Sequence, residues 1–142
     1  MSDQVDHARE QVDEAIGLFL EGQFVSALRL AGAADEILAK ALSDSGQQNS
    51  LELKYEIMEP ILTMRHQTKE DFIRDENRAL NAVRDMASAT DPSVTLDLEE
   101  AASSMIVRAC HNRDLLGLPP IAKMRKFENW FDKHVVGLEY DS

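Results

Sequence analysis

Four polar side chains recur at steps of four, three and four residues along one segment: Arg74, Arg78, Asn81 and Asp85. On a helix, that spacing places all four on one face. Paired arginines on such a face could hold a phosphate or a carboxylate, above all where the face meets its twin across a dimer axis. The row has no histidine to act as a general base near neutral pH, which argues against catalysis. A solvated face with spaced ion pairs is the simpler interpretation, because exposed charged faces are the norm.

The other residues that could do chemistry do not gather into a site. His66 and Glu70 share a helix-face spacing, but a metal site needs more than two such ligands. Cys110 and His111 are adjacent, so on a helix their side chains diverge by about 100°. No glycine-rich phosphate loop, nucleophile elbow or zinc spacing is present. The sequence therefore predicts no metal and no cofactor.

Composition and charge narrow the possible partners. A length of 142 residues predicts a single domain, 1–142. The 26 acidic residues exceed the 15 basic ones, and the net charge of −11 argues against nucleic acid and anionic membranes as partners. The N-terminus does not resemble a signal peptide, and no stretch approaches the length of an apolar membrane span. We therefore expect a cytoplasmic protein, in which the single cysteine excludes an internal disulfide.

Apolar residues recur at three- and four-residue spacing through most of the chain, which predicts an all-α protein. The expected helices cover about 3–21, 25–42, 51–66, 68–87, 97–116 and 120–136, with a loop at 88–96. Thr68 and Asp97 are the expected N-caps of two of them. The segment 21–38 has the rhythm of one tetratricopeptide repeat, but a solenoid needs about three copies. We therefore expect a bundle of five or six helices arranged as up-and-down helical hairpins.

The third expected helix is apolar on two sides. One stripe consists of Leu51, Tyr55, Met58 and Leu62, and the opposite stripe consists of Leu53, Ile57, Ile61 and Met64. A helix of this kind must be covered on two sides, so it lies in the middle of the bundle or meets another subunit. We predict a homodimer on this basis. Pro60 is expected to kink the helix or split it in two.

Two charged residues stand where apolar ones belong. Glu76 lies in the apolar arc of the fourth helix, and Arg113 lies in the apolar arc of the fifth. Antiparallel packing of these helices would bring both to the same level. We therefore predict a partly buried ion pair between them, whose disruption by Glu76→Ala would cost about 3–5 kcal/mol.

Three stretches resemble, in order, an uncharacterised group of small helical bacterial proteins: GLFLEGQFVSALRLAGAADEIL, DPSVTLDLEEA and LGLPPIAKMRKFENWF. That group is similar to HEPN-like bundles, many of which are dimeric ribonucleases with an Arg and a His at the dimer cleft. The resemblance implies a HEPN-like fold. The group often has Asn, two apolar residues and Lys-His before its Asp-Pro loop. Here Asn81 matches and Arg84 replaces the lysine, but Asp85 stands in place of the His and Leu80 in place of the ribonuclease Arg.

These features favour a non-catalytic helical binding or regulatory module. Its candidate ligand-binding residues are Arg74, Arg78, Asn81, Arg84 and Asp85. One alternative is a HEPN-like ribonuclease or nucleotide-handling enzyme that uses the same face, which a deep cleft holding Arg78 and Asp85 from both subunits would favour. A second alternative is a structural interaction domain that meets a protein partner through the second stripe of the third helix.

Overall fold

The computed structural model describes residues 3–84 and 97–137, and within these ranges the regular structure is entirely helical. Seven α-helices follow one another in the described chain: α1 (Asp3–Leu20), α2 (Phe24–Asp44), α3 (Ser50–Met64), α4 (Lys69–Glu76), α5 (Arg78–Arg84), α7 (Leu98–Leu115) and α8 (Ala122–Phe131). A π-helical turn, Asp132–Val136, follows α8. The all-α prediction is confirmed, while the expected loop at 88–96 lies outside the described residues.

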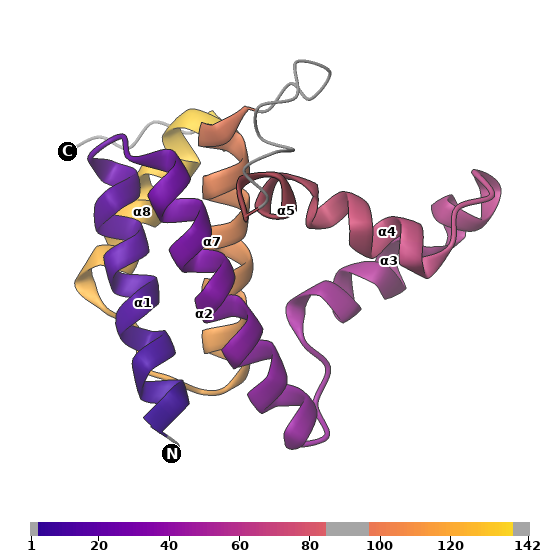
Figure 1. Ribbon diagram of the computed structural model, residues 1–142, viewed down its shortest axis with the longest axis horizontal. Coiled ribbons are helices and arrows are strands. Elements are labelled where there is room, and N and C mark those ends of the chain that lie inside the picture. The colour runs from indigo at the N-terminus through magenta and orange to yellow at the C-terminus, as the bar shows by residue number, and fades with distance from the viewer. Residues whose placement is uncertain (1–2, 85–96, 138–142) are drawn as a thin grey trace.

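A bundle of α1, α2, α7 and α8 contains most of the hydrophobic core (Figure 1). α2 lies between α1 and α7, and α8 packs against α1. The contact face of α2 is rich in alanine, and Ala27, Ala31 and Ala34 are fully buried. Small side chains on this face allow the neighbouring helices to approach closely, and close packing of apolar groups is what stabilises such an interior.

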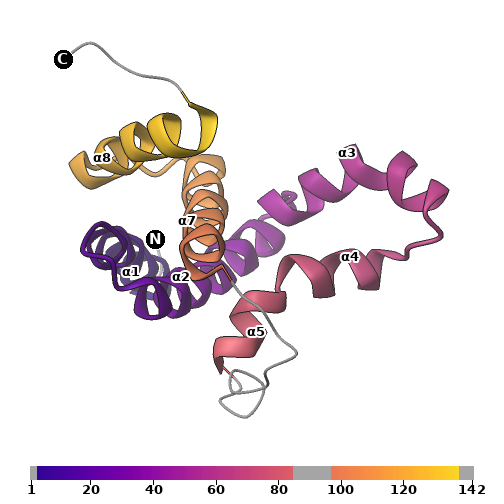
Figure 2. The ribbon, with the colours of Figure 1, turned by 90° about the horizontal axis from the view of Figure 1, so that it is seen from above.

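α3 and α4 project from the bundle as a helical hairpin, which we call the arm, and α5 brings the chain back to α2 (Figures 1 and 2). Each arm helix begins with a capping box, at Asn49 and at Thr68, so that both first turns have satisfied N–H groups. The arm has a small apolar contact of its own, in which the rings of Tyr55 and Phe72 lie 5.7 Å apart. Local caps and this contact hold the hairpin together away from the main core.

One expected helix is interrupted in the structure, and of the two outcomes expected at Pro60 the split does not occur. The fourth expected helix is interrupted at Asn77, between α4 and α5, and the Asn77 side chain accepts a hydrogen bond from Arg108 of α7 at this point. α3 runs unbroken from Ser50 to Met64 with Pro60 inside it, so the proline does not split the helix. α7 begins at the predicted N-cap, where the side chain of Asp97 accepts a hydrogen bond from the backbone of Glu100.

Candidate functional site

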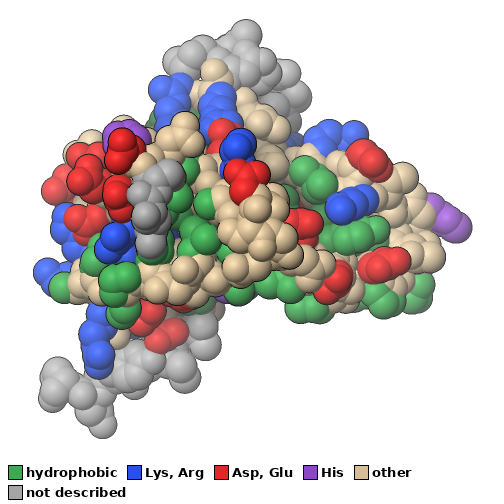
Figure 3. Space-filling model, turned by 90° about the horizontal axis from the view of Figure 1, so that it is seen from below, with side chains coloured by type: hydrophobic (Ala, Val, Ile, Leu, Met, Phe, Trp, Pro, Cys, Tyr) green, Lys and Arg blue, Asp and Glu red, His purple; other side chains and the backbone are tan. Residues whose placement is uncertain are grey.

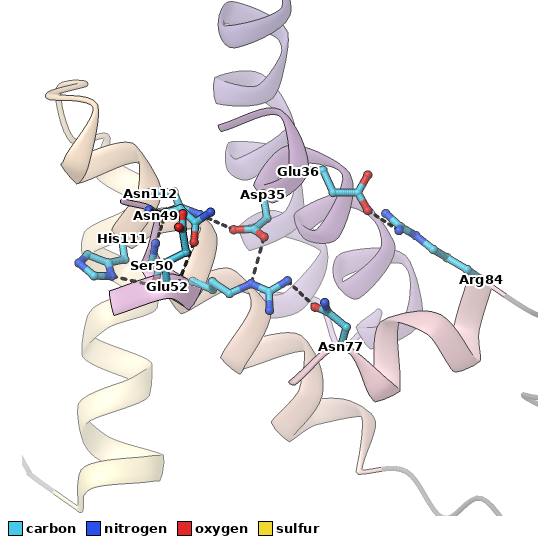
Figure 4. Close-up of polar contacts among 10 residues, drawn as sticks. Asp35, Glu36, Asn49, Ser50, Glu52, Asn77, Arg84, His111 and Asn112 are labelled. Atoms are coloured by element: carbon cyan, nitrogen blue, oxygen red, sulfur yellow. Dashed lines mark hydrogen bonds and ion pairs between the residues drawn. The ribbon is translucent and has the colours of Figure 1, made fainter. Parts of the chain in front are cut away.

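A buried carboxylate lies where the arm joins the bundle. Asp35 of α2 has 6% of its surface exposed. Its Oδ1 accepts a hydrogen bond from Asn112 Nδ2 at 2.6 Å, and its Oδ2 accepts one from Arg108 Nε at 3.0 Å (Figure 4). Both donors come from α7, one turn apart, so the carboxylate joins two central helices of the bundle.

The same two side chains, Arg108 and Asn112, also form hydrogen bonds with residues at the two ends of the arm. Arg108 Nη2 donates to Asn77 Oδ1 at 2.7 Å, at the residue that ends α4. The backbone N–H of Ser50, at the start of α3, donates to Asn112 Oδ1 at 2.7 Å. We call these five residues, Asp35, Ser50, Asn77, Arg108 and Asn112, the Asp35 network. It therefore ties the first and last residues of the arm to one buried carboxylate.

Electrostatics around Asp35 are a balance of opposing effects. Burial raises the pKa of Asp35, and the nearby guanidinium of Arg108 and the hydrogen bond from Asn112 only partly oppose this. Since removing an ion pair from water costs free energy, a buried pair often contributes little net stability. We therefore expect the pair to act mainly by selecting one arrangement of the elements it joins, which here are α2, α7 and the arm.

Two cavities lie beside this network and share Leu51, Leu80 and Arg108 in their walls. The larger, of about 540 Å³, lies between the arm, α5 and α7, and the smaller, of about 260 Å³, lies between α2 and α5. The larger is lined by both signs of charge: Lys54, Arg78 and Arg108 against Asp75, Glu76, Asp97 and Glu100. This balance gives the cavity no preference for a simple anion.

The predicted polar row does not form one site. Arg74 pairs with Asp71 at 2.7 Å on the arm, whereas Arg78 lines the larger cavity. Asn81 and Arg84 line the smaller cavity. Arg84 is also ion-paired with Glu36 of α2. The break at Asn77 separates the row into two helices, and Asp85 lies outside the described residues.

The predicted ion pair between Glu76 and Arg113 is wrong. Glu76 instead accepts a hydrogen bond from Lys54 Nζ at 2.7 Å, within the arm. Arg113 is buried and donates from Nη2 to the carbonyl oxygen of Pro119 at 2.7 Å. The prediction assumed one continuous fourth helix packed along α7. Because that helix breaks at Asn77, Glu76 lies on the projecting arm and stays away from Arg113.

The Asp35 network was not predicted from the sequence, although the chain holds a signal for it. Asp35 lies on the same stripe as the buried Ala31 and Leu38, at spacings of four and three. Asn112 likewise follows the buried Ala109 by three residues on α7. A polar residue on a core stripe needs a buried hydrogen-bond partner, and two such residues on adjacent helices could have been paired.

The described residues contain no group of three or more His, Cys, Asp or Glu side chains arranged to hold a metal ion. His111 does have a specific partner, since its Nδ1 lies 2.8 Å from Ser50 Oγ. In the same described ranges, no helix combines the length and the apolar composition needed to cross a bilayer.

Cys110 is expected to be an unreactive thiol. Burial raises the pKa of Cys110 to about 12, so the reactive thiolate is scarce at pH 8. We expect the folded protein to react with a disulfide reagent such as DTNB about a thousand-fold more slowly than the guanidinium-unfolded chain, whose thiol has an ordinary pKa of about 8.5. A Cys110→Ser variant gives the background. Rapid labelling of the folded protein, at the rate of the unfolded chain, would contradict this assignment.

No family model, curated protein or solved structure matches this chain. The fold class is therefore assigned from the arrangement of the helices alone, which form a packed all-α bundle with a projecting arm.

Proposed function

We propose that the chain is a non-catalytic helical binding or regulatory module that forms a homodimer through its arm. The observation that carries the proposal is the exposure of the second apolar stripe of α3. Ile57 is 77% exposed, Ile61 is 42% exposed and Met64 is 80% exposed. Hydrophobic side chains also gather over the projecting part of the molecule in Figure 3. Contiguous exposed apolar side chains of this kind typically mark an interaction surface.

The first stripe of α3 is already used within the chain, so it cannot serve the same purpose. Leu62 is buried, Tyr55 contacts Phe72 of α4, and Leu51 lines the two cavities at the base of the arm. In the second stripe, Ile57, Ile61 and Met64 are exposed, and Leu53 is partly buried. Ile73 of α4, at 36% exposed, adds a further apolar side chain to the arm surface.

The spacing of the second stripe favours a second copy of this chain as the partner. The residues Leu53, Ile57, Ile61 and Met64 are separated by four, four and three positions, so the stripe is nearly symmetric about its own centre. Two antiparallel α3 helices would therefore place Ile57 against Ile61 and Leu53 against Met64, twice. A surface that is complementary to itself in this way suits the two-fold interface of a homodimer.

Charge also favours the arm as the contact. Residues 1–50 carry 9 acidic side chains and 3 basic ones, so association of two bundles through α1 or α2 would bring like charges together. The second stripe of α3 carries no charge. An arm-to-arm contact keeps the acidic bundles apart and still removes apolar surface from water.

Light scattering tests the homodimer and its interface. We expect the wild-type protein to have twice the monomer mass of 15.9 kDa at micromolar concentration. The double variant Ile57→Gln/Met64→Gln should weaken association about a hundred-fold or more, because each lost apolar contact is worth about 1.5–3 kcal/mol.

The matched control is Val135→Gln, which changes a 55% exposed apolar side chain outside the arm and should leave the dimer intact. Unchanged circular dichroism of all variants shows that folding is preserved. A wild-type monomer at 100 µM would contradict the homodimer and favour a different protein as the partner. A dimer that survives the double substitution would contradict the arm as its interface.

The HEPN-like alternative is an RNA-cleaving or nucleotide-handling dimer that uses the face of Arg74, Arg78, Asn81 and Asp85. Leu80 stands where a HEPN ribonuclease carries its Arg, and it is buried against α2. The aspartate at position 85 offers no imidazole for general base catalysis near neutral pH. We therefore propose the binding module, and expect the pure protein not to cleave RNA in the absence of metal. Cleavage that is abolished by Asp85→Ala would support the alternative.

A further inference from the structure

We propose that the Asp35 network is a latch that fixes the position of the arm against the bundle and thereby sets where the docking surface on α3 is presented. This inference rests on the proposed function for its biological consequence, but the latch itself is a property of a single chain. Its basis is that Asn112 connects Asp35 to Ser50 at one end of the arm, and Arg108 connects it to Asn77 at the other.

Few other contacts hold the arm in place. Among the described helices, α4 packs mainly on α3 and α5. α3 reaches α7 near the base of the arm, where Ser50 Oγ also lies 2.8 Å from His111 Nδ1. The arm contains just two buried hydrophobic residues, Leu62 near the end of α3 and Phe72 near the start of α4. Both are several residues along the chain from the two residues at which the arm joins the bundle. The hydrogen bonds of the Asp35 network therefore provide a large share of the specific attachment between arm and bundle.

The two connections depend on one another because they share one carboxylate. An ionised Asp35 offers two acceptor oxygens to two donors, Arg108 Nε and Asn112 Nδ2. An amide at position 35 would offer one acceptor and one donor, so one of the two donors would lose its partner. Replacing this carboxylate with an amide should therefore free one end of the arm while leaving the shape of the core unchanged.

Hydrogen exchange followed by mass spectrometry tests the latch in the Asp35→Asn variant at neutral pH. We expect peptides covering 50–77 to exchange at least ten-fold faster than in the wild type, whereas peptides from α1 and the first half of α2 should be unchanged. The matched control is Glu36→Gln, which removes the same charge one residue away, from an exposed pair with Arg84. It should leave the arm protected.

Two further variants cut the connections one at a time. Asn77→Ala removes the acceptor for Arg108 and should loosen the α4–α5 joint alone. Ser50→Pro removes the backbone donor for Asn112 at the first position of α3, where a proline is well tolerated, and should loosen only the start of α3. Ser50→Ala keeps that donor and removes only the contact of the hydroxyl with His111 Nδ1, so the difference between the two variants measures the backbone connection alone.

Measurements in the Ile57→Gln/Met64→Gln background separate the latch from dimerisation. If this double variant exchanges at the wild-type rate and Asp35→Asn still accelerates exchange of the arm in it, the latch holds whether or not the protein dimerises. An arm that is equally protected in Asp35→Asn and Glu36→Gln would overturn the latch. Faster exchange spread evenly over arm and bundle would also overturn it, because the network would then be a general stabiliser of the core.

Discussion

The Phe19→Ala variant should lose about 3–5 kcal/mol of unfolding free energy, the usual cost of truncating a buried phenylalanine. Phe19 of α1 is buried at the centre of an aromatic cluster. Its ring centroid lies 4.6 Å from that of Trp130, 5.5 Å from that of Phe127 and 5.3 Å from that of Phe24. The side chain thus joins α1, α2 and α8, and the cavity left by its removal would open where these helices meet.

Chemical denaturation followed by the fluorescence of Trp130 tests this expected loss of stability. Trp130 is the only tryptophan and contacts Phe19 edge to face, so its fluorescence should follow both the loss of the ring and global unfolding. Phe24→Ala is the comparison variant, because Phe24 is only partly buried and should cost less. A Phe19→Ala protein that is no less stable than Phe24→Ala would contradict the central position of Phe19.

Gly32→Ala should destabilise the protein by about 1–2 kcal/mol, although alanine is the better helix former. A methyl group on Gly32 would lie 2.5 Å from Leu80 Cδ1 and 2.7 Å from Leu80 Cδ2, closer than such atoms can approach. Overpacking of this kind costs about 1–3 kcal/mol. The gain in helix propensity offsets at most about 1 kcal/mol of it. The glycine therefore forms a notch in α2 that receives Leu80 of α5.

A double-mutant cycle isolates this contact. Leu80→Ala alone should lose about 2–5 kcal/mol, because it empties the notch. Gly32→Ala/Leu80→Ala should lose less than the sum of the single variants, since the added methyl group fills part of the vacated space and meets no clash. Additive losses, or a Gly32→Ala protein that is more stable than the wild type, would contradict the notch.

Local signals in the sequence predicted the bundle helices well. The apolar spacing of residues 5–19 matches the buried face of α1, and the caps at Thr68 and Asp97 begin α4 and α7 as expected. These features depend on neighbouring residues in the chain and on the apolar stripe that each helix must bury. They can therefore be predicted without knowledge of how the helices are arranged.

The arm and its attachment could not be predicted in the same way. The apolar pattern continues through Asn77 without interruption, and the break there involves a hydrogen bond from Arg108, 31 residues further along the chain. The expected pairing of Glu76 with Arg113 was wrong for the same reason, because it assumed the helix did not break. Long-range polar contacts of this kind leave only a weak trace in the sequence, such as an aspartate on an alanine-rich stripe.

The place of the arm in the chain has a consequence for how the protein folds. α1 and α2 are joined by the three residues 21–23 and pack directly on one another, so their hairpin can form early. The contact between α2 and α7 must instead wait for residues 45–97 to close into a loop, and each doubling of loop length costs about 0.6 kcal/mol of entropy. Docking of α7 onto the preformed hairpin is therefore the expected slow step of folding, and a chain whose arm is replaced by a short linker should fold faster.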